Sequence, residues 1–344
     1  MISAHATFQS LPDARTCWVM SDGTKGMEVQ SIGLAKKMGL DMQYLRIDPP
    51  RLLRSLPYLS LIPGWPLPEM LLDAATDGWP DLVITTGRRM AGLSILIRRH
   101  AGGQTKTIHV QDPRLSPALF DYLIVPSHDR LRGSNVIVTT GSLNALSDDL
   151  IGKAVKSLAP EIRSLPKPVL AVMTGGSNRR YQVNWHDYAA LGEFMASVAG
   201  TMDASLVFVP SRRSLDHAGD AIRQGVKQGS SSPIPFYIWD GEEENPYPGI
   251  LGLADAVVVT SDSVNMTSEA CFSGKPVYTY AFRRETGRIG RFHEIMQESG
   301  HTYPAQHLME REFPSASTAR LDETSRVAAL LRGSADHPET DSPA

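Results

Sequence analysis

The residues best suited to chemistry in this sequence are small and polar, and they follow apolar segments at the point where each segment ends. One such run comes directly after the apolar stretch 169–174. Successive backbone N–H groups in a turn of this kind bind phosphate oxygens without a metal ion, and a following helix adds the positive end of its dipole. A tight turn without a ligand is the alternative. The run is therefore a candidate diphosphate site made of Gly175, Gly176, Ser177 and Asn178, with Arg179 or Arg180 as an added cation.

A second run of small polar residues, 260–270, follows another apolar stretch. Ser263 or Asp262 is suited to cap a helix that begins here, and the N–H groups of the first turn then attract an anion. Asp262 and Glu269 are seven residues apart and fall on nearly the same face of that helix. A carboxylate two turns into the helix accepts hydrogen bonds from a vicinal diol such as ribose. An N-cap and a surface glutamate are the alternative, but we interpret the run, with Ser261, as a ligand site.

The first half of the sequence has the same kind of positions, and some of them carry groups suited to act as a base. The turn after its first apolar stretch contains two glycines and precedes a helix, so it is either a simple turn or an anion site. Arginines after later stretches offer guanidinium groups to phosphate, although solvated arginines are commoner. The candidate ligand contacts are Gly23, Lys25, Gly26, Gln30, Arg88, Arg89 and Arg114. The candidate general bases for a hydroxyl group are Asp22, Asp112, His128 and Asp129.

An acidic loop in the second half, residues 240–245, has two interpretations. Asp240 follows an apolar stretch, which places it where a nucleobase would be contacted. A run of solvated charges is the more common meaning of such a sequence. We keep Asp240 as a candidate contact.

Composition and missing motifs exclude several classes of function. The 34 basic and 37 acidic residues give a net charge of −3, so no global positive field exists to hold nucleic acid. The two cysteines lie far apart, which excludes a disulfide framework. No HExxH, CxxC, GxSxG, GxGxxG, Walker or Asp-x-Asp motif occurs. We therefore expect no metal and no cofactor, and we expect a nucleotide-sugar as co-substrate.

The elements that must position these residues alternate between short apolar runs and longer segments of helical period, which is typical of an α/β fold with parallel sheets. In such sheets ligands bind beyond the carboxyl ends of the strands. The predicted strands are Thr16–Met20, Met42–Ile47, Asp81–Thr86, Thr105–Val110, Tyr122–Pro126, Asn135–Thr140, Val169–Thr174, Ser205–Pro210, Phe236–Asp240, Asp255–Thr260 and Pro276–Ala281.

The chain is long enough for two domains, and prolines at 166 and 168 end the helix predicted over 147–158. We place the boundary there. The expected organisation is a flexible leader (1–15), an N-terminal Rossmann-like domain on the acceptor side (16–163), a C-terminal Rossmann-like domain for the nucleotide-sugar (164–333) with a helix over 318–332, and a disordered tail (334–344). The two domains are expected to face each other across a cleft.

The sequence also bears on location. No secretory signal and no run long enough to span a membrane is present, so we expect a cytoplasmic protein. Residues 50–72 interleave leucines, an isoleucine, a tyrosine and Trp65 with Arg51 and Arg54. This segment either packs on its own domain or enters a membrane interface, which would place the protein at the inner face of a membrane and give it a lipid-linked acceptor.

Several of these strings together resemble the mitochondrial fission ELM ("elongated mitochondria") family of plants and many bacteria. The resemblance covers about residues 16 to 282. It rests on Trp18-x-x-Ser21-Asp22-Gly23-x-Lys25-Gly26 with Gln30, Gly87-Arg88-Arg89, Gln111-Asp112-Pro113-Arg114, Pro126-x-His128-Asp129, Thr174-Gly175-Gly176, Thr260-x-Asp262-Ser263-x-x-Met266-x-x-Glu269-Ala270 and Gly274-Lys275-Pro276-Val277.

The resemblance implies a GT-B glycosyltransferase type of fold, in which the second domain binds the nucleotide-sugar. By analogy Gly175, Gly176 and Ser177 contact the diphosphate, Ser263 and Met266 approach the donor, and Glu269 binds the ribose. The implied function is a metal-independent transfer of a sugar from a nucleoside-diphosphate sugar to a hydroxyl acceptor, with a lipid-linked or envelope-related compound as the candidate acceptor. The alternative is a non-catalytic scaffold that binds a protein partner, because plant members recruit a dynamin-like GTPase to the mitochondrial surface, a binding role that does not require catalysis.

Overall fold

The computed structural model describes residues 10–178, 182–211, 213–242, 244–310 and 320–333. The predicted tail, the first nine residues of the predicted leader, and Arg179 and Arg180 lie outside these ranges. The chain divides into two compact units, residues 1–145 with 322–344 (unit 1) and residues 146–321 (unit 2). Among the described residues, no helix is long and apolar enough to cross a membrane.

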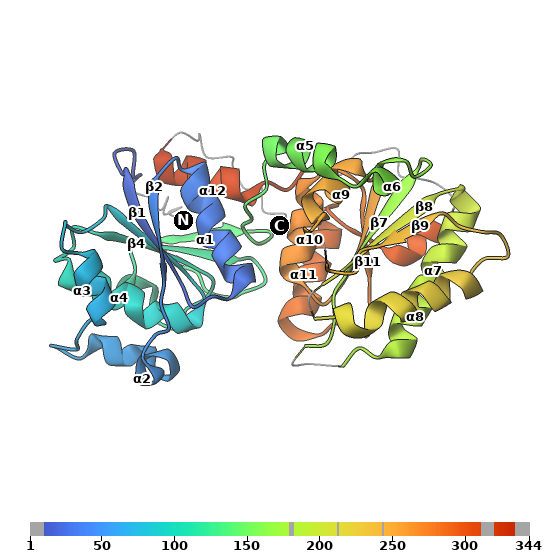
Figure 1. Ribbon diagram of the computed structural model, residues 1–344. Coiled ribbons are helices and arrows are strands. Elements are labelled where there is room, and N and C mark those ends of the chain that lie inside the picture. Colours follow the sequence, from blue (N-terminus) through green and yellow to red (C-terminus); the bar gives the residue numbers. More distant parts are fainter. Residues whose placement is uncertain (1–9, 179–181, 212, 243, 311–319, 334–344) are drawn as a thin grey trace, which may run out of the picture. The chain divides into compact units, whose positions relative to one another are not determined.

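Unit 1 is a parallel sheet with helices on both of its faces (Figure 1). Its strands are short and almost wholly buried except for β2, as expected where helices cover a sheet. In chain order the elements are β1 (Thr16–Ser21), α1 (Lys25–Lys37), β2 (Asp41–Arg46), α2 (Arg51–Ser55), the 3₁₀ helix η1 (Pro57–Leu61), α3 (Glu69–Ala74), β3 (Leu82–Thr86), η2 (Arg88–Met90), α4 (Ala91–His100), β4 (Lys106–Val110), η3 (Pro117–Leu119), β5 (Tyr122–Pro126), β6 (Val136–Thr139) and α12 (Glu323–Arg332).

The strand order of unit 1 is β2-β1-β3-β4-β5-β6, and every pairing is parallel. The order reverses between β1 and β3, because the chain moves from β1 outward to β2 and then returns to the other side of β1. Residues that follow β1 and β3 therefore flank the switch point, where open α/β sheets bind ligands.

Unit 2 is also a parallel sheet covered by helices, in the order β12-β11-β10-β7-β8-β9. Its switch point lies between β7 and β10, which pair with Ala256 beside Leu170. The elements are α5 (Asp148–Ser157), α6 (Pro160–Arg163), β7 (Val169–Thr174), α7 (Trp185–Met202), β8 (Ser205–Pro210), α8 (Leu215–Gln228), β9 (Phe236–Ile238), α9 (Tyr247–Leu253), β10 (Ala256–Thr260), α10 (Val264–Phe272), β11 (Val277–Tyr280), α11 (Gly287–Glu298), β12 (Tyr303–Pro304) and the 3₁₀ helix η4 (Ala305–Glu310).

The domain boundaries differ from those predicted. Helix α5 belongs to unit 2, because it packs on α9 so closely that a Cβ atom on Gly249 would lie 2.7 Å from the carbonyl oxygen of Ala154. Helix α12 belongs to unit 1 and lies beside α1, as Figure 1 shows. Residues 11–14, predicted as flexible, contact α12: the Leu11 N–H donates to the Leu331 carbonyl at 2.6 Å. The prolines at 166 and 168 therefore do not mark the boundary between the two units.

Candidate functional site

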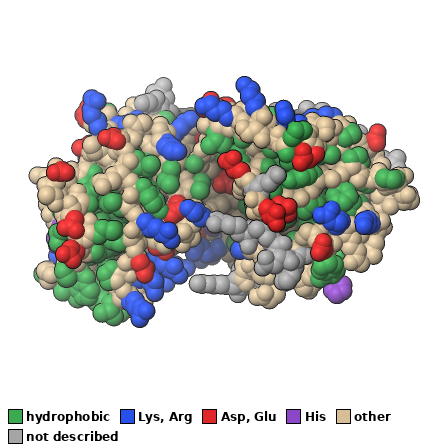
Figure 2. All heavy atoms as spheres, viewed as in Figure 1, with side chains coloured by type: hydrophobic (Ala, Val, Ile, Leu, Met, Phe, Trp, Pro, Cys, Tyr) green, Lys and Arg blue, Asp and Glu red, His purple; other side chains and the backbone are tan. Residues whose placement is uncertain are grey.

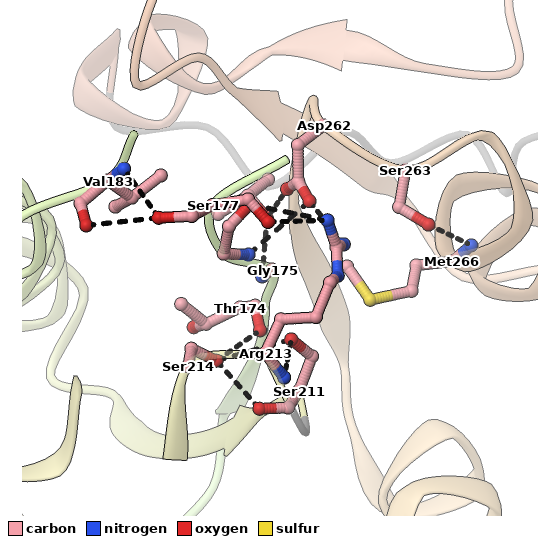
Figure 3. A network of polar contacts seen from close by, with 12 residues as sticks. Thr174, Gly175, Ser177, Val183, Ser211, Arg213, Ser214, Asp262, Ser263 and Met266 are labelled. Carbon is pink, nitrogen blue, oxygen red and sulfur yellow. Dashed lines mark hydrogen bonds and ion pairs between the residues drawn. The ribbon is translucent and has the colours of Figure 1, made fainter. Parts of the chain in front are cut away.

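The glycine turn after β7 lies against the residues that follow β10, across the switch point of unit 2 (Figure 3). A Cβ atom on Gly175 would lie 2.0 Å from Asp262 Oδ1, and one on Gly176 would lie 2.9 Å from the Arg213 carbonyl oxygen. Neither glycine has a positive φ, so each is required for space rather than for backbone conformation. The bare backbone of this turn therefore admits the carboxylate of Asp262.

The first two amides of that turn are bonded within the protein. The Gly175 N–H donates to Thr260 Oγ1 at 2.7 Å, and the Gly176 N–H makes a longer bond to Asp262 Oδ2 at 3.4 Å. The Thr260 hydroxyl in turn donates to Asp262 Oδ1 at 2.6 Å. We predicted that both amides bind phosphate, but in the structure they donate to Thr260 and Asp262 instead. The sequence alone did not reveal these partners.

Arg213 places a positive charge directly over the turn. Its Nη2 lies 2.5 Å from Asp262 Oδ2, and its Nη1 donates to the carbonyl oxygens of Gly176 and Ser177 at 3.3 and 3.4 Å. The Asp262 side chain is fully buried, whereas that of Arg213 is 42% exposed. A carboxylate held out of water needs such a partner. Asp262 therefore holds a guanidinium group that still faces solvent.

Helix α10 begins beside this ion pair. Ser263 is its N-cap, and the Ser263 hydroxyl accepts the N–H of Met266 at 3.3 Å. The other N–H groups of a first helical turn have no partner within the helix, and with the helix dipole they favour an anion. Ser261 lies behind the helix start: its hydroxyl donates to Glu285 Oε1 at 3.1 Å, and its carbonyl accepts from His293 at 2.8 Å.

Glu269 lies two turns into α10, on the side that contacts α9. The Tyr247 hydroxyl of α9 hydrogen-bonds the Glu269 carboxyl and lies 3.4 Å from the Met266 carbonyl oxygen. Burial raises the pKa of Glu269 from 4.5 to about 7, and the bond from Tyr247 opposes this rise only in part. Burial and the nearby carboxyl also raise the pKa of Tyr247. Glu269 is thus a carboxyl group that changes protonation near neutral pH.

The remaining predicted contacts of unit 2 take local roles. The Ser177 hydroxyl accepts the Val183 N–H at 2.9 Å and so closes the loop that follows the glycine turn. Asn178 is half-buried in that same loop. Asp240 accepts the Glu242 N–H at 3.0 Å and is exposed at the carboxyl end of β9.

In unit 1, Asp22 and Arg89 meet across the switch point between β1 and β3. Arg89 Nη1 lies 3.2 Å from Asp22 Oδ2, and the Thr24 N–H donates to Asp22 Oδ1 at 3.1 Å. Burial works against the Asp22 carboxylate, but the bonds from Thr24 and Arg89 outweigh it and lower its pKa. A carboxylate with a lowered pKa is a weak base, so this geometry favours an anchoring role for Asp22.

The other three candidate bases follow two further strands and lie in two local pairs, His128 with Asp129 and Asp112 with Arg114. His128 and Asp129 follow β5 and are both buried, with 4.0 Å between Nε2 and Oδ1. Asp112 follows β4 and accepts the Arg114 N–H at 2.8 Å in a turn where Arg114 has a positive φ of 59°. Because all strands of the sheet are parallel, both pairs lie at the same edge as Asp22.

Of the predicted ligand contacts around α1 and η2, some side chains are buried and others are exposed. Gln30 is buried and donates to the Gly26 carbonyl within α1 at 3.0 Å, whereas Lys25 pairs with the buried Glu28 at 2.9 Å. The backbone of Gly23 has a positive φ of 87°. Arg88 and Arg114 are exposed.

Sequence reasoning missed Arg213 and Tyr247. Arg213 follows the predicted strand Ser205–Pro210, so the rule applied to the other strand ends would have found it. Tyr247 carries no such signal, because it reaches Glu269 only through the packing of α9 on α10. Among the described residues, no group of three or more His, Cys, Asp or Glu side chains is placed to hold a metal ion.

Comparison with known proteins identifies the family. The family model for mitochondrial fission ELM1 matches residues 25–334. The chain belongs to this family. It is 31% identical to the mitochondrial fission protein ELM1 of Arabidopsis thaliana over 249 residues, which cover 65% of this chain and 56% of that protein. It therefore spans about half the length of the plant relative. It is 26% identical to an uncharacterized protein of Rickettsia prowazekii (strain Madrid E), over 76% of this chain and 82% of that one.

Solved structures confirm the predicted GT-B type of fold. The chain resembles UDP-GlcNAc 2-epimerase from Neisseria meningitidis bound to UDP-GlcNAc, with a TM-score of 0.53, 15% identity, and coverage of 92% of this chain and 98% of that one. The UDP-GlcNAc 2-epimerase of Methanocaldococcus jannaschii gives a TM-score of 0.55 at 13% identity, with coverage of 92% of this chain and 99% of that one. MurG of Acinetobacter baumannii gives a TM-score of 0.53 at 13% identity, with coverage of 93% of this chain and 99% of that one. At these identities the likeness concerns the fold.

Proposed function

We propose that unit 2 binds a nucleoside-diphosphate sugar and that the protein is a glycosyltransferase that transfers the sugar to a hydroxyl acceptor. The observation that carries the proposal is the Asp262–Arg213 pair at the switch point, which holds a solvent-facing guanidinium between the glycine turn and the start of α10. An anion placed there meets a fork of N–H donors and a helix N-terminus at the same time.

In the proposed complex the diphosphate is bound chiefly by Arg213 and by the first turn of α10. The Gly176 N–H joins them, because its bond to Asp262 is long enough, at 3.4 Å, to be exchanged for a phosphate oxygen. Thr174 adds one more group at this edge: its hydroxyl is buried and has no hydrogen-bond partner among the described residues. Negative charge that develops on the leaving diphosphate is stabilised by the same groups.

Glu269 is the proposed ligand of the ribose. A carboxylate accepts hydrogen bonds from two vicinal hydroxyl groups, and Glu269 stands two turns beyond the phosphate end of the same helix. Because its pKa is about 7, nucleotide binding selects the ionised form. The two ribose hydroxyl groups then donate hydrogen bonds to the carboxylate and replace part of the water that burial removes from it.

The acceptor base is proposed to come from the strand ends of unit 1. We assign it to His128, with Asp129 beside it to stabilise the cation formed when the ring takes up a proton. In the transfer the acceptor oxygen loses its proton to a base and forms a bond to the anomeric carbon. The bond from that carbon to the diphosphate breaks, and the diphosphate leaves with the electron pair.

Membership of the ELM1 family favours a second candidate, a protein that binds a nucleotide but recruits a partner instead of catalysing a reaction. The two candidates share the nucleotide site. They differ in whether a bound nucleotide-sugar is turned over.

Calorimetric titration with UDP and UDP-GlcNAc, in buffer containing EDTA, tests the shared part. UDP is the first choice because the structurally similar Neisseria enzyme is bound to UDP-GlcNAc. Arg213→Lys keeps the charge but loses the fork, and we expect its affinity to fall about tenfold, since a hydrogen bond to a charged group contributes ~1.5–3 kcal/mol. Lys153→Ala, an exposed cation on α5, is the matched control.

The outcomes separate the candidates. Binding that weakens in Arg213→Lys but not in Lys153→Ala supports the site, and release of UDP from UDP-GlcNAc in the presence of a hydroxyl acceptor supports the transferase. Binding without release favours the recruiting protein. If no nucleoside diphosphate binds to the unaltered protein, the proposal fails.

A further inference from the structure

Unit 1 exposes a group of large apolar side chains in one short segment. Eleven large apolar side chains of the described residues are exposed, and five of them fall within residues 52–62. Their exposed fractions range from 38% to 62%. Single exposed apolar residues are ordinary, but a contiguous group marks a contact surface. We call this group the 52–62 patch; it consists of Leu52, Leu56, Tyr58, Leu61 and Ile62.

The patch is held in place by buried contacts beneath it. Leu53, between two patch residues, is fully buried against Gly92 of α4, where a Cβ atom would lie 2.8 Å from the leucine side chain. Arg99 of α4 donates to the carbonyl oxygens of Ser60 and Ile62, at 2.5 and 3.3 Å. Because η1 is fixed to α4 in this way, the exposure of the patch is a stable property of the fold.

Basic groups lie beside the patch. Residues 49–68 contain no Asp or Glu. Arg51 is exposed, whereas Arg54 of the same short helix pairs with the exposed Asp48 at 3.2 Å. Next to Ile62, a pocket of about 200 Å³ is lined by Trp65, Leu96, Arg99 and His100 together with Gly64. Figure 2 shows hydrophobic side chains gathered over the region of α2, with Lys and Arg side chains beside them. Apolar side chains within a basic rim are complementary to an anionic lipid surface.

We propose that the 52–62 patch docks unit 1 on an anionic lipid bilayer. The apolar side chains of α2 and η1 enter the interface, and Arg51 and Arg99 face the phosphate groups. A second copy of the chain fits less well, because a two-fold contact would bring the basic rims of both copies together. The proposal goes beyond nucleotide binding and does not depend on it.

Co-sedimentation with vesicles tests the docking. The full chain is mixed with vesicles of phosphatidylcholine, or of phosphatidylcholine with about one-third phosphatidylglycerol. We expect binding to the anionic vesicles that weakens as salt is added. Arg51→Gln should lower the partition coefficient about fivefold, the effect of one basic residue near such a surface. Leu52→Ser and Leu61→Ser should each lower it about tenfold, because each removes one buried apolar side chain.

Trp185→Ser, which removes an exposed aromatic side chain of unit 2, is the matched control and should partition as the unaltered protein does. A Tyr58→Trp reporter distinguishes insertion from adsorption. Brominated acyl chains quench it beyond the quenching of the five native tryptophans in the unaltered protein only if the ring passes the headgroups. Circular dichroism melting verifies that each variant is folded.

Equal sedimentation of the unaltered protein and Leu52→Ser, or no binding to anionic vesicles, would overturn the proposal. So would a shift to a dimer in light scattering that Leu52→Ser abolishes while lipid binding stays absent, since the patch would then bind a second copy.

Discussion

Replacing Glu269 by glutamine should make the protein more stable at alkaline pH and a poorer binder of nucleotide. Glutamine has nearly the same shape and still accepts a hydrogen bond from Tyr247, but it carries no charge. The variant therefore separates the cost of burying a carboxylate in α10 from the packing of the side chain.

The size and sign of the effect follow from the raised pKa of Glu269. The native pKa is about 7 and the ordinary value is 4.5. Between these values the native state holds a proton that the unfolded state has released, so the free energy of unfolding falls as pH rises from about 4.5 to 7. At 1.36 kcal/mol for each pH unit the full loss is ~3 kcal/mol, and partial contact of the side chain with solvent reduces it to ~2 kcal/mol. Glu269→Gln removes this loss.

Urea unfolding at pH about 5 and about 8.5 measures the difference, because the midpoint follows the free energy of unfolding at constant slope. We expect similar midpoints for both proteins at the lower pH and a higher midpoint for Glu269→Gln at the upper one. Glu193→Gln, an exposed glutamate on α7, measures the loss of a surface charge. In parallel titrations UDP should bind Glu269→Gln more weakly. The reasoning is refuted if Glu269→Gln is destabilised equally at both pH values.

Three further predictions concern packing and charge. Gly175→Ala should destabilise unit 2 by ~1–3 kcal/mol and weaken UDP binding, because its Cβ would collide with Asp262. Gly219→Ala on α8, with open space around it, should raise the free energy of unfolding by ~0.5–1 kcal/mol and so move the urea midpoint upward. Gly225→Ala, whose Cβ would lie 1.9 Å from the Ala189 carbonyl oxygen, should lower the melting temperature and leave α7 and α8 less protected from hydrogen exchange. Burial lowers the pKa of His109 to about 3, so its neutral ring stabilises the fold above pH 6.5 and this contribution is lost as pH falls toward 3. In His109→Gln the free energy of unfolding should therefore fall less steeply as the pH is lowered. An unchanged slope of that free energy against pH would contradict this.

The strands of this fold could be predicted from the sequence because the sheets are parallel and buried on both faces. Tyr122–Pro126, Val169–Thr174 and Ser205–Pro210 begin and end where the pattern of apolar residues predicted. The two-residue strand β12 was missed, since it is too short to show a pattern. The domain partition was wrong where it depended on long-range packing: the burial of Val327 and Leu331 with the α1 side of the first sheet leaves no local signal near residue 322.

The candidate site was predictable in position and less so in detail. The rule that ligands bind beyond strand ends selected Gly175 and Asp262, and the structure brings them together at the switch point. What the sequence could not reveal is which donors already have partners. The Gly175 N–H is bonded to Thr260 because β7 and β10 are neighbours, a fact of topology rather than of spacing. The contact between Arg213 and Asp262 has the same origin.

Two carboxylates beside these sheets, the exposed Asp81 and the more deeply placed Glu269, differ in a way that bears on function. At the amino edge, Asp81 accepts the N–H groups of Thr16 and Arg15, both at 2.8 Å, and these bonds lower its pKa. Such a carboxylate stabilises the fold as it joins strands. At the carboxyl edge of unit 2, burial instead raises the pKa of Glu269, so its charge costs stability at neutral pH. Packing alone would be served better by an uncharged side chain, so a glutamate here is consistent with the proposed role of Glu269 as a ligand of the ribose.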